Sequence, residues 1–487
     1  MNKSKVIILL RSFSREELKK FRDFLQSPYF NKNKTLLKYF DLLKKDHPLF
    51  DTEKSGREKI YHKLFKGKKY NEQVMKNLTS DLNKLCKEFL ITEFSRKDIY
   101  ENKLNLLKQM ILRKADSVFY SELKIFEAEL KKISELSEKN FYYLYQLEEA
   151  KISFHLERNE QTLVFDKVLK SGEYLILFFL LNLTKTISNL NVNSQSFNVK
   201  YDVNLSQEFF NKTSIEEIIE YMKKNEIEFS ETAELYFYRI ICNTSPFNEK
   251  YYYKFKSLVL KNLRSLGRIE VYGLFNALET FCLIKGNSGK SEFINELFEI
   301  FNLEIDNNFY KYSESSPVTF MKFRNTYSIA LSLKKLDWAE KFIEKYKNEI
   351  IESDRENVIK IATAQLEFEK GNFNKVLESI ADINADHIYS KVDIRNLTVM
   401  SYYELNYTES ALSMLDSFKH FINGSRNMSG VFRENHMRFI NSLHSLIINK
   451  EKKHKDKLEE LKEKLLPYKN DRRSNWIISK IDLLSNY

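Results

Sequence analysis

A short stretch near the N-terminus holds the side chains of this sequence that are best suited to binding an anion. Three lysines surround one glycine there, and three polar residues follow at helical spacing: Lys66, Lys68, Lys69, Gln73, Lys76 and Asn77. Clustered ammonium groups attract phosphate oxygens, and amide side chains form hydrogen bonds with phosphates or base edges. The chemistry that this stretch predicts is binding of a polyanion, with no covalent bond made or broken.

Residues 57–90, which contain this stretch, have the pattern of two amphipathic helices joined by a turn around Gly67. A DNA-binding helix-turn-helix would place the second helix, from about residue 71 to residue 90, in a groove of the duplex. The connecting turn is longer than the three to four residues usual in that motif, and Asp81 and Glu88 would face or flank the DNA. A structural hairpin is therefore favoured over a sequence-specific reader, and a less specific contact with RNA or phosphate stays open.

The net charge of +11 lies entirely in the first 90 residues. These contain 22 Lys and Arg against 11 Asp and Glu, whereas the remaining residues contain 57 of each kind. A charge excess confined to one part of a chain is typical of contact with a polyanion. The alternative is a lysine-rich solvated face without a partner, because no run of like charges here is as long as those of interaction tails.

No motif in the sequence combines the residue types that catalysis or metal binding requires. Gly289-Lys290-Ser291 resembles the end of a phosphate-binding loop, but Ile284 stands where that loop needs its first glycine, and a helix is predicted before it in place of a strand. No two of the eight histidines are three or four residues apart, as a metal site on one helix needs. We therefore expect no enzymatic activity, no metal and no cofactor, and we interpret residues 284–291 as a turn between helices.

The elements that position these residues are predicted to be helices throughout the chain. Only ten Gly and five Pro occur in 487 residues, fewer than the turns of a β-sheet protein need, and apolar residues recur with the helical period. Two capping boxes, one at Ser14 and one at Ser214, predict helix starts, because each serine is followed three residues later by glutamate. The polar stretches 188–206 and 306–317 are predicted to be loops.

Cysteine spacing and apolar runs predict the compartment. Cys86, Cys242 and Cys282 are too far apart in the sequence to suggest a disulfide framework or a zinc site, so we expect buried thiols in a reducing compartment. The longest apolar run, centred on residues 174–181, has about half the length of a membrane crossing. The apolar run 6–10 is shorter than that of a secretory signal. A cytoplasmic protein without membrane insertion is therefore expected.

Three predicted joints between helices recur after residue 317. Each has an aromatic residue preceded by a capping residue: Asp337 and Trp338, Asn372 and Phe373, and Asn406 and Tyr407. The aromatic residues are separated by 35 and 34 residues. Each repeat is therefore predicted to be a helical hairpin whose second helix begins at the capping residue, with the aromatic side chain packed against the preceding helix.

The spacing of these joints, and their order of small or Leu, polar and aromatic residue, resemble the tetratricopeptide repeat family. The middle joint has Gly371, Phe373 and Val376 where that family has a glycine, an aromatic and a small residue, whereas the first and third joints have leucine in place of glycine. The closing proline of the family is absent from all three joints. The resemblance covers about residues 318–420 and implies a fold of stacked hairpins. The first 90 residues also resemble uncharacterised bacterial helical-repeat proteins, through the segments SPYFN, LFKGKKYN and NLTSDL, which implies no known activity.

We therefore predict an all-α protein in which a compact basic helical block precedes an irregular α-solenoid of stacked, tetratricopeptide-like hairpins. The predicted divisions are the basic block 1–92, an array of long helices 93–310 with the loop near 188–206, and the repeats with terminal capping helices 311–487. Such arrays form a groove that holds a peptide or a protein. The predicted function is a non-enzymatic interaction or scaffold protein, and the alternative is a DNA regulator or RNA-bound protein that contacts phosphate through the basic block.

Overall fold

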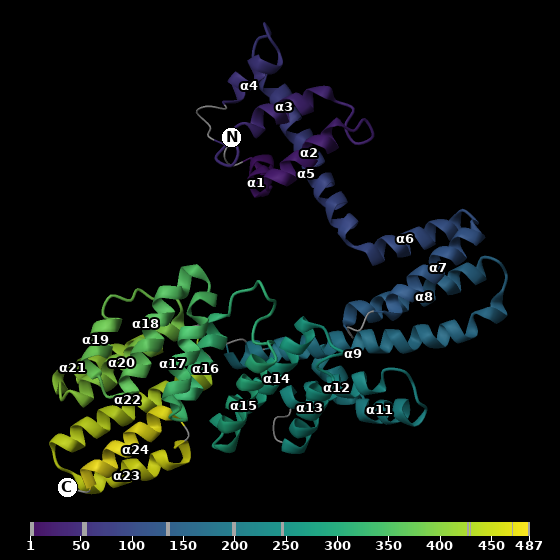
Figure 1. Cartoon of the computed structure of the whole chain (residues 1–487). Helices are drawn as coiled ribbons and strands as arrows, with labels where there is room; N and C mark the ends of the chain where they lie inside the picture. Colours follow the sequence, from purple (N-terminus) through teal and green to yellow (C-terminus); the bar gives the residue numbers. More distant parts are fainter. Residues whose placement is uncertain are drawn as a thin grey trace. The chain divides into compact units, whose positions relative to one another are not determined.

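The chain is helical throughout the computed structural model, which describes residues 4–50, 56–132, 137–196, 201–244, 248–425, 428, 430–469 and 471–485 (Figure 1). These residues form 24 α-helices and three short 3-10 helices, and their one isolated β-bridge joins Val318 to Ile350. The prediction of an all-α fold is confirmed. No helix in the described part of the chain combines the length and the apolar composition that a membrane crossing requires.

The helices belong to two compact units. The first unit comprises Met1–Leu130 and Gln146–Val168, and the second comprises Lys131–Tyr145 and Leu169–Tyr487. The helices that have residues in the first unit are α1 (Lys5–Ser12), α2 (Arg15–Gln26), α3 (Lys34–Lys44), α4 (Arg57–Leu64), α5 (Glu72–Lys97), α6 (Ile99–Leu112), α7 (Asp116–Lys131), α8 (Glu138–Leu156) and α9 (Phe165–Ser196). The last three of them also have residues in the second unit.

Helices α1 to α5 enclose a core of aromatic and aliphatic side chains. Phe21 of α2 lies 5.0 Å from Phe40 of α3 and 5.2 Å from Phe89 of α5, measured between ring centroids. Full burial of such a side chain stabilises the fold by about 1.5–3 kcal/mol. The capping box at the start of α2 is confirmed, since Ser14 and Glu17 exchange hydrogen bonds of 2.7 and 3.1 Å. Helix α1 was not predicted, although its three buried residues fall in the apolar run 6–10.

The second unit continues the succession of helices to the C-terminus, joined by short turns. Its remaining helices are α10 (Leu205–Lys212), α11 (Ile215–Lys224), α12 (Ser230–Thr244), α13 (Glu249–Lys261), α14 (Arg268–Asn287), α15 (Glu292–Asp306), α16 (Phe320–Ser332), α17 (Leu336–Tyr346), α18 (Glu352–Glu369), α19 (Phe373–Ile380), α20 (Ile388–Glu404), α21 (Thr408–Gly424), α22 (Gly430–Glu451), α23 (Lys455–Leu465) and α24 (Arg472–Ser485). The turn predicted at residues 284–291 is confirmed, because α14 ends and α15 begins there.

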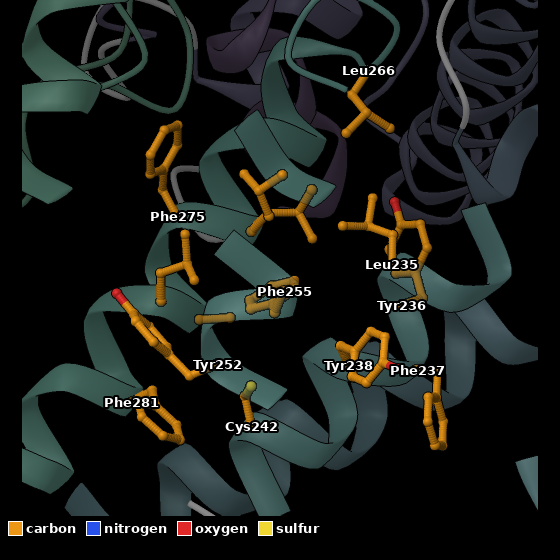
Figure 2. Close-up of a cluster of buried hydrophobic side chains, with 14 of the residues drawn as sticks. Leu235, Tyr236, Phe237, Tyr238, Cys242, Tyr252, Phe255, Leu266, Phe275 and Phe281 are labelled. Carbon is orange, nitrogen blue, oxygen red and sulfur yellow. The ribbon is translucent and has the colours of Figure 1, made fainter. Parts of the chain in front are cut away.

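A large apolar core lies among α12, α13 and α14 (Figure 2). Tyr252 of α13 stacks on Phe281 of α14 with their ring centroids 4.7 Å apart, and the thiol of Cys282 donates a hydrogen bond of 3.2 Å to the Tyr252 hydroxyl. All three cysteines are buried and free, as predicted. Burial raises the pKa of each thiol to about 12, so the cysteines behave as core residues.

Two predictions about the middle of the chain differ from the structure. The stretch expected to form a loop from about residue 188 is helical as far as Ser196, and residues 197–200 lie outside the described part of the chain. Tertiary contacts hold this end of α9, because Ser188 accepts a hydrogen bond of 2.7 Å from Asn243. The capping box expected at Ser214 is wrong, because its backbone has a ψ of 69° and its side chain makes no capping bond.

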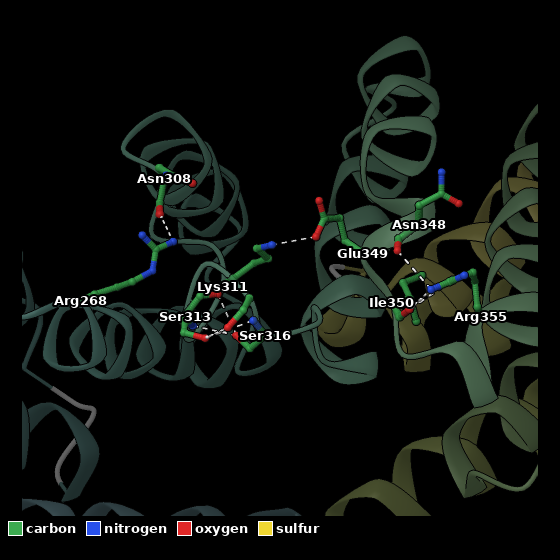
Figure 3. Close-up of polar contacts among 10 residues, drawn as sticks. Arg268, Asn308, Lys311, Ser313, Ser316, Asn348, Glu349, Ile350 and Arg355 are labelled. Carbon is green, nitrogen blue, oxygen red and sulfur yellow. Dashed lines mark hydrogen bonds and ion pairs between the residues drawn. The ribbon is translucent and has the colours of Figure 1, made fainter. Parts of the chain in front are cut away.

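The polar stretch predicted as a loop at 306–317 does connect two helices, α15 and α16 (Figure 3). Lys311 of this loop pairs with Glu349 at 2.7 Å, and the main chain of Val318 donates to the Glu349 carbonyl at 2.8 Å. On the far side of that contact, the Arg355 guanidinium donates to the carbonyl of Ile350 at 3.0 Å. The loop is therefore tied to the end of α17 and the start of α18 by side-chain and main-chain bonds.

The three predicted joints share one main-chain geometry. Each contains a residue in the left-handed region: Lys334 with φ 57°, Gly371 with φ 82° and Asn406 with φ 56°. At every joint the amide of the residue that follows the left-handed one donates a hydrogen bond of 2.9 Å to the carbonyl five positions before it. These bonds run from Lys335 to Ala330, from Asn372 to Glu367 and from Tyr407 to Tyr402. These bonds define a Schellman motif, which closes the end of the preceding helix.

Two of the three capping residues predicted at these joints are wrong, and the third has the predicted position without a capping bond. Helix α17 begins at Leu336, so Asp337 lies inside the helix, and Asn406 precedes Tyr407, which is the N-cap of α21. Asn372 is the N-cap of α19, but its side chain bonds to Glu367 in place of the helix amides. The main-chain bonds of the Schellman motif already fix where each second helix starts, and they leave the side chains without a capping role.

Lys453, which follows α22, repeats this geometry with a φ of 53° and provides a test of it. A side chain in the left-handed region is strained by roughly 1 kcal/mol. Lys453→Gly is therefore expected to raise the free energy of unfolding by about that amount, measured by urea denaturation. Lys452→Gly is the matched control, and it should lower stability because Lys452 is not in the left-handed region. A loss of stability in both variants would contradict the strain.

Candidate functional site

Three clefts adjoin one another in the second unit. The first cleft has a volume of about 560 Å³ and is lined mainly by α9, α12, α14 and α16. The second cleft has a volume of about 310 Å³ and is lined mainly by α16, α18, α20, α22 and α24. The third cleft has a volume of about 520 Å³ and is lined mainly by α15, α18, α20 and α24. Leu283 and Asn325 line both the first and the second cleft, and Phe368 and Arg472 line both the second and the third. Neighbouring clefts therefore share part of their walls, and we call the three clefts together the inner groove.

Amide side chains from four alternate helices line the second cleft. They are Asn325 of α16, Gln365 of α18, Asn396 of α20 and Asn435 of α22. The Oδ1 atom of Asn396 is buried and has no hydrogen-bond partner among the residues that the structure describes. A buried acceptor without a donor is unfavourable by about 1–3 kcal/mol. The wall of the second cleft therefore contains an unsatisfied acceptor.

A paired arginine and aspartate stand in the wall of the same cleft. The Nε and Nη2 atoms of Arg324 donate to the two carboxylate oxygens of Asp393 at 2.5 and 2.6 Å. Burial alone would lower the pKa of Arg324, but the adjacent Asp393 outweighs burial and raises it. This two-point contact joins α16 to α20 and fixes the spacing of the helices that carry the amides.

Side chains of α24 cross the groove to α18 and α20. Arg472 donates to Glu369 at 2.5 and 2.8 Å and to Gln365 at 3.2 Å. The indole N–H of Trp476 donates to Glu404 at 2.8 Å, and Lys480 pairs with the same carboxylate at 2.5 Å. The C-terminal helix therefore forms one wall of the second and third clefts.

His436 lies buried at the end of the second cleft, with the guanidinium of Arg473 against its ring nitrogens at 2.5 and 3.1 Å. Burial lowers the pKa of His436 well below its ordinary value, and the positive charges of Arg473 and Arg324 lower it further. The imidazole is therefore neutral at neutral pH. It accepts a hydrogen bond from Arg473 and holds that guanidinium in the wall of the groove.

This lowered pKa predicts a dependence of stability on pH. The unfolded chain protonates His436 below about pH 6.5, whereas the folded chain does not, so the folded state should lose about 1.4 kcal/mol for each further unit of acidification. Glutamine at this position keeps an acceptor for Arg473 and does not titrate. The difference in free energy of unfolding between wild type and His436→Gln should therefore be constant above pH 6.5 and change in favour of the variant below it. If the free energies of unfolding of wild type and His436→Gln, measured by urea denaturation, changed in parallel with pH across this range, the buried histidine could not be neutral.

Cations outnumber anions along the inner groove. Nine Lys and Arg side chains are among the described residues that line it: Lys185, Arg239, Lys322, Arg324, Lys334, Lys469, Arg472, Arg473 and Lys480. Six acidic side chains line it: Glu270, Glu279, Glu369, Asp393, Glu404 and Asp471. Since residues 91–487 carry no net charge as a whole, the groove is more positive than the rest of this part of the chain.

A buried cluster of charges forms part of the first cleft. The ammonium group of Lys322 donates to Glu279 at 2.8 Å and to Glu304 at 2.5 Å, and it lies 4.5 Å from the ring centre of Tyr272. Burial, and then the neighbouring Glu279, raise the pKa of Glu304 well above its ordinary value. Burial alone would lower the pKa of Lys322, but the two carboxylates outweigh it and raise that pKa. Lys322 therefore stays charged and holds α14, α15 and α16 together.

The predicted polyanion-binding residues lie on the surface of the first unit. Lys66, Lys68 and Lys69 are exposed in the turn between α4 and α5, and none of them forms an ion pair with a residue that the structure describes. On α5, Lys76 pairs with Glu72 at 3.1 Å. The two amides beside it bond to each other, from Gln73 to Asn77 at 2.9 Å. Of the six predicted residues, Lys66, Lys68 and Lys69 are therefore unpaired among the described residues, whereas Gln73, Lys76 and Asn77 already have partners.

The residues that define the predicted repeat have different surroundings. Gly371 and Phe373 line the third cleft, and Phe373 lies 5.2 Å from Phe368 of the preceding helix. The ring of Trp338 stacks within its own helix, and its indole N–H donates to Asn302 of α15 at 3.0 Å. Tyr407 is half exposed. Sequence reasoning therefore found part of the third cleft and missed the amides, His436 and Arg239. A single arginine inside the apolar run 235–242 was the available signal for the last of these.

Neither a family model, nor a curated protein, nor a solved structure matches this chain.

Proposed function

We propose that this chain is a non-enzymatic interaction protein that holds an extended, acidic peptide segment of a partner in its inner groove. The observation that carries the proposal is the set of four amide side chains that line the second cleft from four alternate helices. The proposal includes a tetratricopeptide-like array of helical hairpins, in which the first helix of each hairpin faces the groove.

Amide side chains suit the main chain of a peptide because each provides both a donor and an acceptor. An extended peptide presents N–H and C=O groups along its whole length, with about 3.3 Å between residues. Amides placed on successive helices can therefore bind it without regard to its side chains. The unsatisfied Oδ1 atom of Asn396 is one position where a peptide N–H group would replace a missing bond.

The charge of the groove supports an acidic segment as the occupant. The nine cations that line it exceed the six acids, and Lys469 and Lys334 stand at the wall of the third cleft. Complementary charge raises the rate of association and selects among partners. Acidic residues of the peptide would pair with Lys469, and with Lys334 in competition with its present partner Glu369, while the amides hold the main chain of the peptide.

Selection from a displayed library of random peptides on the purified full chain tests this function. Peptides with more Asp and Glu than the starting library should be enriched, and their affinity should fall about tenfold or more with Asn396→Leu, because the peptide loses a hydrogen bond and meets an apolar group. Asn348→Leu is the matched control, since Asn348 is exposed and lies outside the groove. Enrichment of no sequence, or enrichment that ignores Asn396, would reject the groove as a peptide site.

A second function is proposed on a separate observation, the three exposed lysines Lys66, Lys68 and Lys69 without described ion-pair partners. Unpaired ammonium groups around Gly67 suit a phosphate backbone, so a nucleic-acid-associated role is the alternative to the peptide-binding role. Fluorescence anisotropy of the full chain with duplex DNA and with structured RNA, across a salt series, tests it. Binding that weakens with salt and falls further in Lys66→Glu/Lys68→Glu/Lys69→Glu would support the role. Negligible binding at low salt would reject it.

A further inference from the structure

Arg239 of α12 lies in the wall of the first cleft, and two of its nitrogen atoms have no hydrogen-bond partner. The residue is 8% exposed, and its Nε and Nη1 atoms bond to no residue in the described part of the chain. Burial lowers the pKa of the guanidinium, yet arginine keeps its charge in proteins. A buried charge that lacks a bonded partner is strongly unfavourable. The fold therefore maintains a cation here that a ligand can neutralise.

The nearest acidic side chains are already bonded to other groups. Glu270 accepts hydrogen bonds from Lys185 at 3.1 Å and from the hydroxyl of Tyr236 at 2.9 Å. Glu138 accepts from the same Lys185 at 2.6 Å. Both carboxylates act on Arg239 through space, but neither forms a hydrogen bond with it. The Nε and Nη1 atoms of the guanidinium are therefore left without a bonded acid in the wall of the cleft.

Room for such a ligand exists beside the guanidinium. The guanidinium lies against Gly273 of α14, where a Cβ atom would be only 3.4 Å from Nη2, so a larger side chain at this position would crowd the guanidinium. Three large apolar side chains line the same cleft and are exposed: Ile269, Tyr312 and Met321. The cleft volume of about 560 Å³ is within the range of small-molecule sites.

We propose that the first cleft binds a small organic monocarboxylate. Its carboxylate group pairs with the guanidinium of Arg239, and its apolar body lies against Ile269, Tyr312 and Met321. A carboxylate suits this position better than a phosphate, because Lys185 and Lys322 already neutralise Glu270 and Glu279 in the same walls. Arg239 alone is left for the ligand, and one cation matches a single negative charge. The site stands on Arg239 and does not require a peptide in the second and third clefts.

Calorimetric titration of the full chain with hexanoate tests the proposal. Hexanol, hexylammonium and inorganic phosphate serve as comparison probes, since they lack the carboxylate, reverse its charge or lack the apolar body. Hexanoate should bind saturably and more tightly than the other three. Arg239→Met should weaken hexanoate binding about 10- to 100-fold, the effect of losing hydrogen bonds to a charged group. Arg264→Met, on an exposed arginine, is the matched control and should leave binding unchanged.

Thermal unfolding of the same variants separates a binding role from a structural one. Without ligand, Arg239→Met should melt at or above the temperature of the wild type, because it removes a buried charge that no protein group bonds. Gly273→Leu should keep the helix and weaken hexanoate binding by filling the space beside the guanidinium. No saturable hexanoate binding up to about 10 mM, equal binding of inorganic phosphate, or a markedly lower melting temperature for Arg239→Met would each overturn the proposal.

Discussion

Replacing Lys322 with methionine is expected to lower the free energy of unfolding by about 3–5 kcal/mol. The methionine fills the volume of the lysine stem but leaves Glu279 and Glu304 buried without their cation. Glu304 is fully buried, and one of its carboxylate oxygens already lacks a described hydrogen-bond partner. The structure therefore offers these carboxylates no replacement for the ammonium group. Urea denaturation of the two proteins, followed by circular dichroism, measures the difference.

The loss in Lys322→Met should depend on pH in a defined direction. Burial already raises the pKa of Glu304 in the wild type, and loss of the Lys322 charge raises it further, so the folded state of the variant takes up a proton before the unfolded chain does as the pH falls. The destabilisation should accordingly be largest at about pH 8 and smaller at about pH 5. Adding Glu279→Gln and Glu304→Gln to the variant should restore part of the lost stability.

Lys360→Met provides the comparison for this charge removal. Lys360 pairs with Glu356 one turn away on the exposed face of α18, where solvent screens the pair. This variant should unfold at nearly the same urea concentration as the wild type. Equal effects at Lys360 and Lys322 would show that the buried cluster makes no special contribution to stability.

Either single substitution of the Arg324–Asp393 pair is expected to destabilise the fold by about 3–5 kcal/mol. Arg324→Met leaves the Asp393 carboxylate buried, and Asp393→Leu leaves the partly buried guanidinium without its acid, so each variant contains one unpaired charge. The double variant contains neither charge. It should therefore be more stable than the sum of the two single losses predicts, with a coupling energy of a few kcal/mol.

A double-mutant cycle measured by urea denaturation gives this coupling directly. Arg239 makes a useful contrast, because it is more deeply buried than Arg324 but lacks a bonded acid. Methionine should therefore be destabilising at Arg324 and neutral or stabilising at Arg239. Additive losses at Arg324 and Asp393 would mean that their contact contributes only packing.

Local signals in the sequence predicted most of the helices but fewer of their ends. The capping box at Ser14 formed because the serine has the extended backbone conformation that directs its hydroxyl at the amide of Glu17. The same residue types at Ser214 did not form one, because the backbone there is turned differently. A capping motif therefore predicts a bond only where the preceding chain can extend.

Long-range contacts explain the larger differences. The polar residues after Ser188 suggest a loop by composition, but the bond from Asn243, 55 residues away, extends the helix through them. The joints near Trp338 and Tyr407 differ for a local reason, because they are closed by main-chain bonds between residues five positions apart, which single-residue capping preferences do not reveal. The contact between Asn243 and Ser188, by contrast, depends on which helices come together, and no local pattern contains that information.

The candidate groove was harder to predict than the helices. Its polar lining comes from residues as far apart in the sequence as Lys185 and Lys480. In its own stretch of sequence, each of these lysines looks like an ordinary polar residue of an amphipathic helix. The lysines around Gly67 were conspicuous because they are adjacent in sequence. The sequence analysis therefore favoured the lysines around Gly67, which are adjacent in the sequence. It missed the inner groove, whose side chains come together only in the folded protein.

The bonds from α24 to α18 and α20 have a mechanical consequence. A run of helices joined by short turns stretches like a spring, because small rotations at each turn add along its length. Here Arg472 bonds to Glu369, 103 residues earlier, and Lys480 bonds to Glu404. A pulling force on this part of the chain would load these bonds before the intervening turns could unwind. Residues 369–472 should therefore act as a stiff segment with low compliance, set between turns that yield more easily.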